Sequence, residues 1–307
     1  MFPIIPANSA TAASGNDEGI FAFGNSITNT RYGMSNLVSN AGVVGTDVAA
    51  VGTARYTPAA CEYGGDKGIF AYGMTASAKV NTINLISNAG VVASDTAGAG
   101  TIRYLGMAAS YGEDKGIFAF GNDGNVMNES NLVSNAGVIS SDVTGVGTAR
   151  DAGGACEYGG DKAIFGFGTY GAVIPRSMTN LVSNVGVVAT DTTGVGTARL
   201  YGPAACGYGT DKGIFGFGTT GPYGGDYVSM SNLVSNAGVV ATDTTGVGTA
   251  RARLAATQYG SDKGIFAYGQ DGSDQSMSNL VSDAGVISSD VTGVGTVRGG
   301  MAACSFN

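Results

Sequence analysis

Histidine and tryptophan are absent from the 307 residues of this chain. Without histidine, the Ser–His and Cys–His pairs that activate the nucleophile in many hydrolases cannot form. The four cysteines include no C-x-x-C pair, so the usual spacing of zinc ligands is missing as well. We therefore expect no catalytic residues of these kinds, no metal site and no cofactor.

Charge is scarce, and long apolar runs are missing. Only 12% of the residues are charged, and the net charge is −8. Most basic residues recur with the repeat described below, which leaves Arg31, Lys79, Arg176 and Arg253 outside it. Because phosphate binding needs clustered Lys and Arg, this composition argues against nucleic acid as a partner. No run of ~18 apolar residues occurs, so we expect no membrane insertion. The opening M-F-P-I-I-P lacks the basic segment of a secretory signal, and none is expected.

Glycine and repetition are what the chain has in excess. Its 53 glycines and 43% hydrophobic residues favour short strands and tight turns over disorder. A phrase close to D-K-G-I-F-A-Y-G, a variable insert and M-S-N-L-V-S-N-A-G-V-V-A-T-D-T-T-G-V-G-T-A-R recurs six times, with a small-residue A-A-C-x-Y-G segment between copies. The isoleucine of the phrase recurs every 47 to 51 residues, at Ile20, Ile69, Ile117, Ile164, Ile214 and Ile265. A fixed period in this range is typical of a propeller, a solenoid or an array.

Each copy divides into four short β segments, which in the second copy are residues 59–63, 68–73, 84–88 and 91–95. Glycine-containing turns separate the segments, and no window has sustained helical periodicity. The repeat therefore predicts an all-β, six-bladed β-propeller with four-stranded antiparallel blades. One domain would span residues 1–307, with residues 1–9 as a possible N-terminal arm. A β-solenoid with four strands per coil is the alternative.

Seven segments match the small-residue strand, although the I-F strand occurs only six times. The two terminal candidates are residues 9–14 and residues 301–306. The C-terminal M-A-A-C-S-F fits the consensus better than the N-terminal copy. We therefore predict that the C-terminal strand joins blade one and closes the propeller.

The I-F-x-[FY]-G strand resembles the I-Y-x-x-G-G strand of kelch repeats over the whole chain. The second glycine of the kelch doublet is replaced in every copy, and the kelch tryptophan is missing. An arginine precedes each small-residue strand, where kelch repeats often carry one: Arg55, Arg103, Arg150, Arg199, Arg251 and Arg298. The resemblance implies a kelch-like fold and no particular kelch function. The motif N-L-V-S-N-x-G-V-V is also similar to glycine-rich repeats of phage and environmental bacterial structural proteins. This resemblance implies a virion or cell-surface location.

The four cysteines share one repeat position, at Cys61, Cys156, Cys206 and Cys304. We align Ser14, Ser110 and Thr257 with them in the other copies. A position that accepts Cys, Ser and Thr selects for a small side chain, so we expect free and buried thiols.

Aspartate recurs in two series. The first lies in the first turn, each beside a lysine: Asp66, Asp114, Asp161, Asp211 and Asp262. These residues could form a ring of cation sites, but we favour Asx-type turns in which the carboxylate accepts backbone N–H groups and the lysine is solvated. The second series follows the fourth segment, at Asp47, Asp95, Asp142, Asp191, Asp243 and Asp290. For these we expect Arg–carboxylate pairs that link blades.

Variation between copies is confined to the insert after the I-F strand and to the residues after each arginine. Because strands alternate in direction, both stretches emerge on one face, and the near-invariant G-G-D-K and S-N-A-G turns emerge on the other. A scaffold that fixes one face and varies the other favours recognition on the variable face, with neutral drift as the alternative. Tyrosine and arginine are enriched at contact hot spots. The candidate partner-binding residues are Arg31, Tyr32, Tyr170, Arg176, Tyr201, Tyr223, Tyr227 and Arg253.

These patterns predict a non-catalytic structural or interaction protein that binds a protein partner in a larger assembly, at a virion or cell surface. A carbohydrate-binding, lectin-like propeller is the alternative, because tyrosines beside Asn and Asp can stack on sugars and bond to them. A glycan-cleaving enzyme is less favoured, because nearly every acid belongs to a repeat series. Asp226 and Asp274 are among the few acids that do not.

Overall fold

The computed structural model describes residues 17–171, 174–221 and 225–307. Their regular structure is entirely β, with twenty strands and no helix, as the sequence predicts. The described residues consequently include no helix long and apolar enough to cross a membrane.

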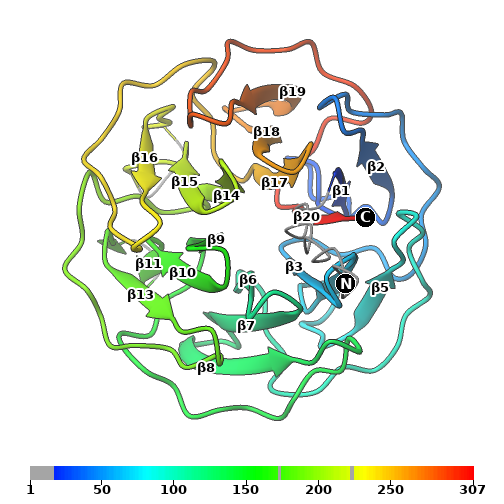
Figure 1. Cartoon of the computed structure of the whole chain (residues 1–307). Coiled ribbons are helices and arrows are strands. Elements are labelled where there is room, and N and C mark those ends of the chain that lie inside the picture. The colour runs from blue at the N-terminus through cyan, green and yellow to red at the C-terminus, as the bar shows by residue number, and fades with distance from the viewer. Residues whose placement is uncertain (1–16, 172–173, 222–224) are drawn as a thin grey trace, which may run out of the picture.

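The strands form six antiparallel sheets of three strands, arranged around a common centre in Figure 1. In each sheet the I-F strand is central, with the small-residue strand on its inner side and the N-L-V strand on its outer side. The sheets are β20–β1–β2 (Ala302–Phe306, Glu18–Ala22, Ser35–Val38), β3–β4–β5 (Ala59–Tyr63, Lys67–Ala71, Ile83–Ile86), β6–β7–β8 (Met107–Tyr111, Lys115–Asn122, Val126–Val133), β9–β10–β13 (Gly154–Tyr158, Lys162–Gly166, Thr179–Val182), β14–β15–β16 (Ala204–Tyr208, Lys212–Gly216, Ser231–Val234) and β17–β18–β19 (Ala255–Tyr259, Lys263–Gln270, Asp274–Val281). A two-stranded sheet, β11–β12 (Thr169–Tyr170, Ile174–Pro175), lies in one insert.

The two ends of the chain meet in one sheet. Strand β20 pairs antiparallel with β1, in a register that places Phe306 opposite Glu18 and Cys304 opposite Ile20. The predicted pairing of the C-terminal strand with the first copy is thus confirmed. The competing segment at residues 9–14 and the possible arm at residues 1–9 lie outside the described residues.

The expected fourth strand is not a strand in any of the six sheets. In the first copy this segment makes only two isolated bridges to β2, Ser35 with Val48 and Val38 with Val44. A side chain holds the segment in place of a full ladder: the amide of Asn36 donates to Gly45 O (3.0 Å) and to Asp47 Oδ1 (2.9 Å). The prediction of four-stranded sheets is therefore wrong, because a buried asparagine replaces part of the backbone pairing.

The core lies between neighbouring sheets. Phe23, after β1, packs edge-on against Phe70 of β4 with ring centroids 5.5 Å apart. Arg55 is fully buried, lies 3.9 Å from the centre of the Phe23 ring and donates to Asn84 Oδ1 (2.7 Å). All six repeat arginines lie over an aromatic ring in this way. The arginine thus connects two sheets through a ring on one and an amide on the other.

Arginine–aspartate pairs occur as expected, but only at long range. Arg55 Nη1 lies 4.0 Å from Asp95 Oδ1, and three other copies have separations of 3.9 to 4.0 Å. The aspartate bonds more closely to Thr53, whose N–H and hydroxyl both donate to it (2.9 and 2.6 Å). Thr53 lies in the link from the preceding copy, so this carboxylate joins the link to the outer segment of the next sheet.

The carboxylates of the first turn bond mainly to side chains and only weakly to backbone N–H groups, and the lysine is paired and not merely solvated, so the predicted Asx-type turn is not what holds them. Asp114 accepts a bond from Lys115 Nζ and another from Asn135 Nδ2 (3.1 Å). The carboxylate therefore joins the G-G-D-K turn to the S-N-A-G turn of the same sheet. Among the described residues no three acids or cysteines are grouped closely enough to hold a metal ion.

The four cysteines are free and buried, as predicted. The alignment of Ser110 with them is wrong, because the register pairs Ala109 with Ile117 as it pairs Cys61 with Ile69. Ser110 therefore occupies the position of Glu62. A slip of one residue moves a side chain to the other side of a strand, and here it moves Ser110 to the centre of the molecule. Ser14 lies outside the described residues.

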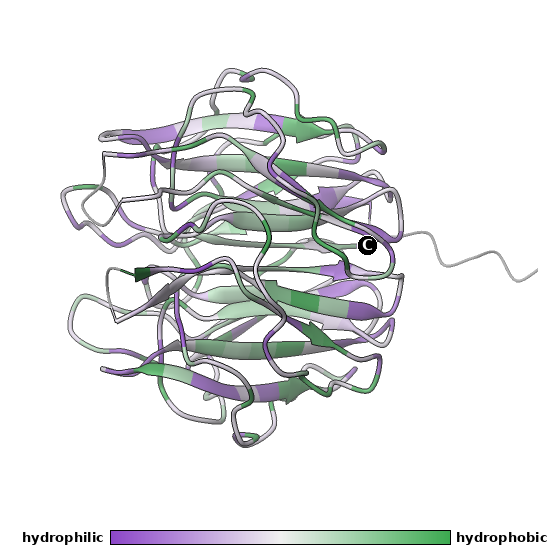
Figure 2. Cartoon of the chain, turned by 90° about the vertical axis from the view of Figure 1, so that its left-hand side faces the viewer, coloured by the Kyte–Doolittle hydropathy of each residue, from purple (hydrophilic) through white to green (hydrophobic). Residues whose placement is uncertain are grey.

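The inserts and the residues after each arginine share one face, as expected. They are joined by the bridges Asn25–Gly299, Tyr56–Met74, Tyr104–Asn122, Asp151–Thr169, Leu200–Thr219 and Ala252–Gln270. We call this the variable face, and the face with the G-G-D-K and S-N-A-G turns the constant face. Figure 2 shows the strands running between the two faces, with the C-terminus at the constant face.

Candidate functional site

The six inner strands enclose a cavity of about 180 Å³ at the centre of the molecule. Because each strand contributes equivalent residues, the cavity is built in layers of six. Two of these layers differ from copy to copy, and the layer between them does not. The differing layers are where the repeat can acquire specific chemistry.

The first layer forms the mouth of the cavity on the variable face: Thr57, Leu105, Ala152, Tyr201, Arg253 and Gly300. Backbone hydrogen bonds connect this layer from copy to copy and back to the start: Leu105 N to Thr57 O, Ala152 N to Leu105 O, Gly202 N to Ala152 O, Arg253 N to Tyr201 O, Gly300 N to Arg253 O and Thr57 N to Gly300 O. The mouth is therefore held by main-chain bonds, and its side chains are free to vary.

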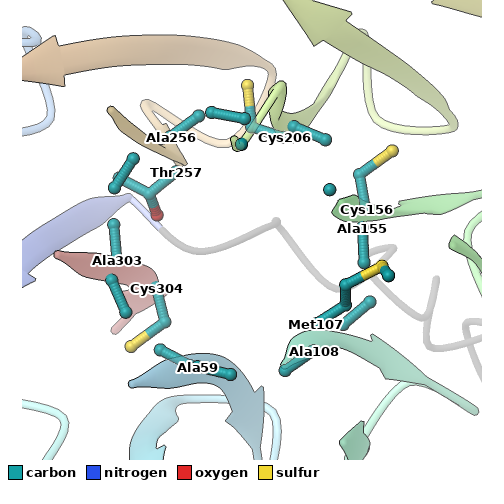
Figure 3. Close-up of a pocket in the computed structure, with 18 of the residues that line it drawn as sticks. Ala59, Met107, Ala108, Ala155, Cys156, Cys206, Ala256, Thr257, Ala303 and Cys304 are labelled. Carbon is teal, nitrogen blue, oxygen red and sulfur yellow. The ribbon is translucent and has the colours of Figure 1, made fainter. Parts of the chain in front are cut away.

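The second layer is a belt of six alanines, Ala60, Ala108, Ala155, Ala205, Ala256 and Ala303. Four of them are labelled around the cavity in Figure 3, beside Met107, Cys156, Cys206 and Cys304. Burial raises the pKa of the Cys206 thiol to about 12, so this thiol stays protonated and unreactive at neutral pH. The belt is apolar and uniform, and it offers no group for catalysis.

The third layer lies toward the constant face and is polar and irregular: Glu62, Ser110, Glu157, Gly207, Gln258 and Ser305. Ser305 Oγ donates to Glu62 Oε1, and the Glu62 N–H donates to Ser110 Oγ (3.0 Å). Burial, and next the charge of Glu157, raise the pKa of Glu62 well above its usual value. Burial raises the pKa of Glu157 to about 7. The two carboxyl groups therefore hold protons more tightly than glutamates in water.

Cations stacked on tyrosines form the second feature of the variable face. The guanidinium of Arg31 lies 4.2 Å from the centre of the Tyr56 ring, and Lys79 Nζ lies 5.9 Å from that of Tyr104. Arg253 lies 5.4 Å from the centre of the Tyr201 ring. The same arrangement joins Arg176 to Tyr170 at 5.6 Å. All four basic residues outside the repeat are thus placed over a tyrosine on this face.

The structure brings the predicted residues together in part. It pairs Arg253 with Tyr201 and Arg176 with Tyr170, whereas Arg31 stacks on Tyr56 and not on its sequence neighbour Tyr32. Tyr32 and Tyr227 are half-buried; the Tyr32 N–H donates to Gly24 O (2.9 Å), and Tyr227 bridges to Thr219. Tyr223 lies outside the described residues.

Sequence reasoning missed Tyr56, Tyr104 and Asp151, although all three directly follow a repeat arginine. That position reads Tyr, Tyr, Asp, Leu, Ala and Gly in the six copies, which is the signal that could have identified it. The Tyr56 and Tyr104 rings are 6.2 Å apart. Burial raises the pKa of Tyr104, and Tyr56, Asp151 and Tyr201 raise it further, so these four residues lie near one another.

Asp151 lies close to Tyr104 and is only 3% exposed. Its Oδ2 accepts a bond from Asn122 Nδ2 (2.8 Å), and burial raises the pKa of its carboxyl group. The residue therefore serves as a buried anchor for the insert that begins at Asn122.

Comparisons with known proteins find no matching family model and no matching curated protein. Inferences about function therefore rest on the geometry of the cavity and the variable face.

Proposed function

We propose that the chain is a single six-bladed, kelch-like β-propeller that binds a protein partner through its variable face and does not catalyse a reaction. The fold part of the proposal is supported by six equivalent three-stranded sheets, by the pairing of β20 with β1 and by the main-chain bonds that connect all six copies around the cavity mouth. Propellers are built from such repeated sheets around a central channel.

The observation that carries the functional part is the division of charge between the two faces. On the constant face the lysines lie beside aspartates, as Lys67 does beside Asp66 and Lys212 beside Asp211 (2.8 Å for the second pair). On the variable face the four non-repeat cations lie over tyrosines instead. Aromatic residues and arginine dominate the energy of protein interfaces. The variable face thus has the composition of an interface.

Carbohydrate binding is the second candidate. Tyr170 favours it, because this side chain is 43% exposed and its ring can act as a stacking platform for a sugar. Arg176 lies over this ring at 5.6 Å, farther than Arg31 lies from Tyr56 (4.2 Å), so Tyr170 is the more open of these two platforms.

Site-specific photocross-linking tests the protein-partner proposal. A photoreactive phenylalanine analogue is placed at Tyr170 or Tyr227 on the variable face, and at Asn88 or Asn236 on the constant face as matched controls, in the native host. We expect protein adducts of one defined mass from the first two positions and not from the controls. Equal adducts from both faces, or none from the variable face, would contradict the proposal.

A glycan array separates the two candidates. The partner proposal predicts no glycan binding that is sensitive to Tyr170→Ala. Binding of one glycan class that is lost in this variant and kept in Asn88→Ala would replace the protein partner by a carbohydrate.

A further inference from the structure

Six side chains at the centre of the variable face form one contiguous group, the channel-mouth cluster: Arg31, Lys79, Arg253, Tyr56, Tyr104 and Tyr201. The Tyr56 and Tyr104 rings are neighbours, and Arg31 and Lys79 each lie over one of them. Arg253 and Tyr201 belong to the mouth layer itself and are joined through a main-chain bond of 3.1 Å. All six side chains are half-buried, so they are held in place and remain accessible.

The three cations have donors to spare. None of them forms an ion pair with an acid in the described part of the chain. Lys79 gives one bond, to the backbone oxygen of Asp123 (2.6 Å), out of the three that an ammonium can donate. Arg31 donates through Nη1 to the backbone and side-chain oxygens of Asn29, and its Nε is buried, which leaves Nη2 as the donor open to a partner. A guanidinium placed over a ring can still donate to a carboxylate through its terminal nitrogens.

The carboxylates of Asp123, Asp151 and Asp274 already accept hydrogen bonds from the inserts. Asp123 accepts the N–H of Asn125 (2.9 Å), and Asp151 is buried against Asn122. Asp274 accepts the N–H of Ile27 (2.8 Å) and the amide of Gln270 (2.8 Å). These carboxylates therefore hold the inserts in shape and do not neutralise the cations through direct contact.

An apolar recess lies directly below the cluster. The cavity of about 180 Å³ extends from the mouth past the alanine belt to the polar layer, and its part next to the mouth is lined by the alanines. Apolar cavities of ~150 Å³ accept a molecule as large as benzene. The recess can therefore take one aliphatic side chain, while the cations above it take neighbouring carboxylates.

We propose that the channel-mouth cluster binds an acidic peptide segment of the partner protein, whose carboxylates bond to Arg31, Lys79 and Arg253 and whose aliphatic side chain enters the cavity. This inference rests on the proposed function and specifies the chemistry of the partner. A peptide fits better than a sugar, because the tyrosine rings of the cluster already carry cations and the alanine belt below the mouth has no side chain that can bond to the hydroxyl groups of a saccharide.

Fluorescence anisotropy with the labelled peptide E-E-L-E-E tests the inference. The whole protein carries a net charge of −8 and repels this probe in general, so binding requires the local cations. We expect saturable binding that weakens as salt is added, and that weakens about tenfold or more in the double variant Arg31→Gln/Arg253→Gln. The peptides Q-Q-L-Q-Q and E-E-S-E-E are expected to bind more weakly, the first for lack of charge and the second for lack of an aliphatic anchor.

The double variant Lys67→Gln/Lys212→Gln is the matched control, because it changes the net charge equally on the constant face. It is expected to stay within about twofold of the native affinity. An equal loss in both double variants, equal binding of Q-Q-L-Q-Q, or no binding of E-E-L-E-E would overturn the inference. Tighter binding of an oligogalacturonate that is lost only in the Arg31→Gln/Arg253→Gln variant would do the same in favour of an acidic glycan. Circular dichroism melting confirms that each variant is folded.

The peptide-binding result and the cross-linking result test different proposals and can be interpreted separately. If cross-links form from Tyr170 while the acidic peptide does not bind, the protein-partner proposal stands and the acidic-segment inference fails. If neither experiment succeeds, both fail.

Discussion

Single buried side chains carry much of the structure of this protein. Each repeat arginine is fully buried and stacks on an aromatic ring of one sheet, and five of the six donate to an asparagine of the next sheet. Arg150 instead donates to the backbone oxygens of Phe167 and Thr148. Burial lowers the pKa of Arg55 to about 10, so the side chain stays charged at neutral pH. A buried arginine of this kind needs its donors satisfied, which explains why it recurs with the same asparagine in each copy.

The glutamates of the polar layer predict an unusual dependence of stability on pH. Because the pKa of Glu157 is about 7 in the folded protein and near ~4.3 in an unfolded chain, the folded state binds the proton more tightly. This contribution is fully present below the unfolded pKa and is lost as pH rises through the folded value. We therefore expect the free energy of unfolding in urea to fall by on the order of 2 kcal/mol between pH 5 and 8.

The double variant Glu62→Gln/Glu157→Gln is expected to remove most of this slope, because burial raises the pKa of both carboxyl groups and neither amide titrates. Asp123→Asn, which removes an exposed loop carboxylate, is the control and is expected to keep it. A slope that is the same in all three proteins would show that the cavity glutamates do not hold protons as the geometry implies.

For single residues, the sequence predicted which side chains are small and buried better than it predicted the register of the inner strands. Cys61 and Thr257 at one repeat position indicated a small buried side chain, because Cys and Thr share little besides size. Glu62 and Glu157 stood two residues from the glycine turn, and nothing in their pattern showed that they face each other across a cavity. The strand register is needed to see it. The pairing of Ala109 with Ile117 places Ser110 at the same position as Glu62, and the misaligned Ser110 hid this position from the sequence comparison.

At the level of strands and links, the outer segment of each sheet is held by side chains instead of a ladder. Asp95 accepts two bonds from Thr53 and one from Asn84 (2.9 Å), and Arg55 lies nearby. These bonds lower the pKa of Asp95, although burial opposes the change. The network joins the link from one copy to the sheet of the next.

Removing this carboxylate is expected to loosen the link without unfolding the sheet. Asp95→Ala leaves the donors of Thr53 and Asn84 without an acceptor, which costs about 1–3 kcal/mol of unfolding free energy. Native-state hydrogen exchange should accelerate at residues 91–96 and not in β4. Thr46→Val, a change at an exposed residue of an equivalent segment, is the control, and an equal effect there would argue against the network.

The strand pattern predicted three of the four segments correctly. The fourth is not a strand, because an asparagine side chain replaces part of its backbone pairing. The sequence also indicated one continuous strand over residues 68–73, whereas β4 ends at Ala71 and the next residue, Tyr72, has a φ of +64°. A non-glycine residue in this conformation costs about 1–2 kcal/mol. Stacking of Tyr72 with Phe118 (5.4 Å) and Arg103 (4.4 Å) offsets that cost, and both partners come from the next copy or its link, which no local pattern can show.

For the whole molecule, the repeat predicted the architecture better than it predicted the site. Six similar copies with a matching C-terminal segment were enough to infer that β20 joins β1. The cavity was not inferred, because a space between six strands depends on how all of them assemble. The variable face was identified from disagreement among copies, but the pairing of Arg31 with Tyr56 required contacts between residues of different copies.

The central claim is that the six copies form one closed six-bladed propeller. Closure would place all the inserts together on the variable face and all the G-G-D-K turns together on the constant face. A cross-link between β1 and β20 tests it most directly. Glu18 and Phe306 are register partners, and the Cα atoms of such partners lie ~4.5–5.5 Å apart, within the range of a disulfide. We predict that Glu18→Cys/Phe306→Cys forms an intramolecular disulfide under mild oxidation in the native state, detected by mass spectrometry of the proteolysed monomer. Free thiols at both positions, or disulfides only between molecules, would contradict the closed propeller.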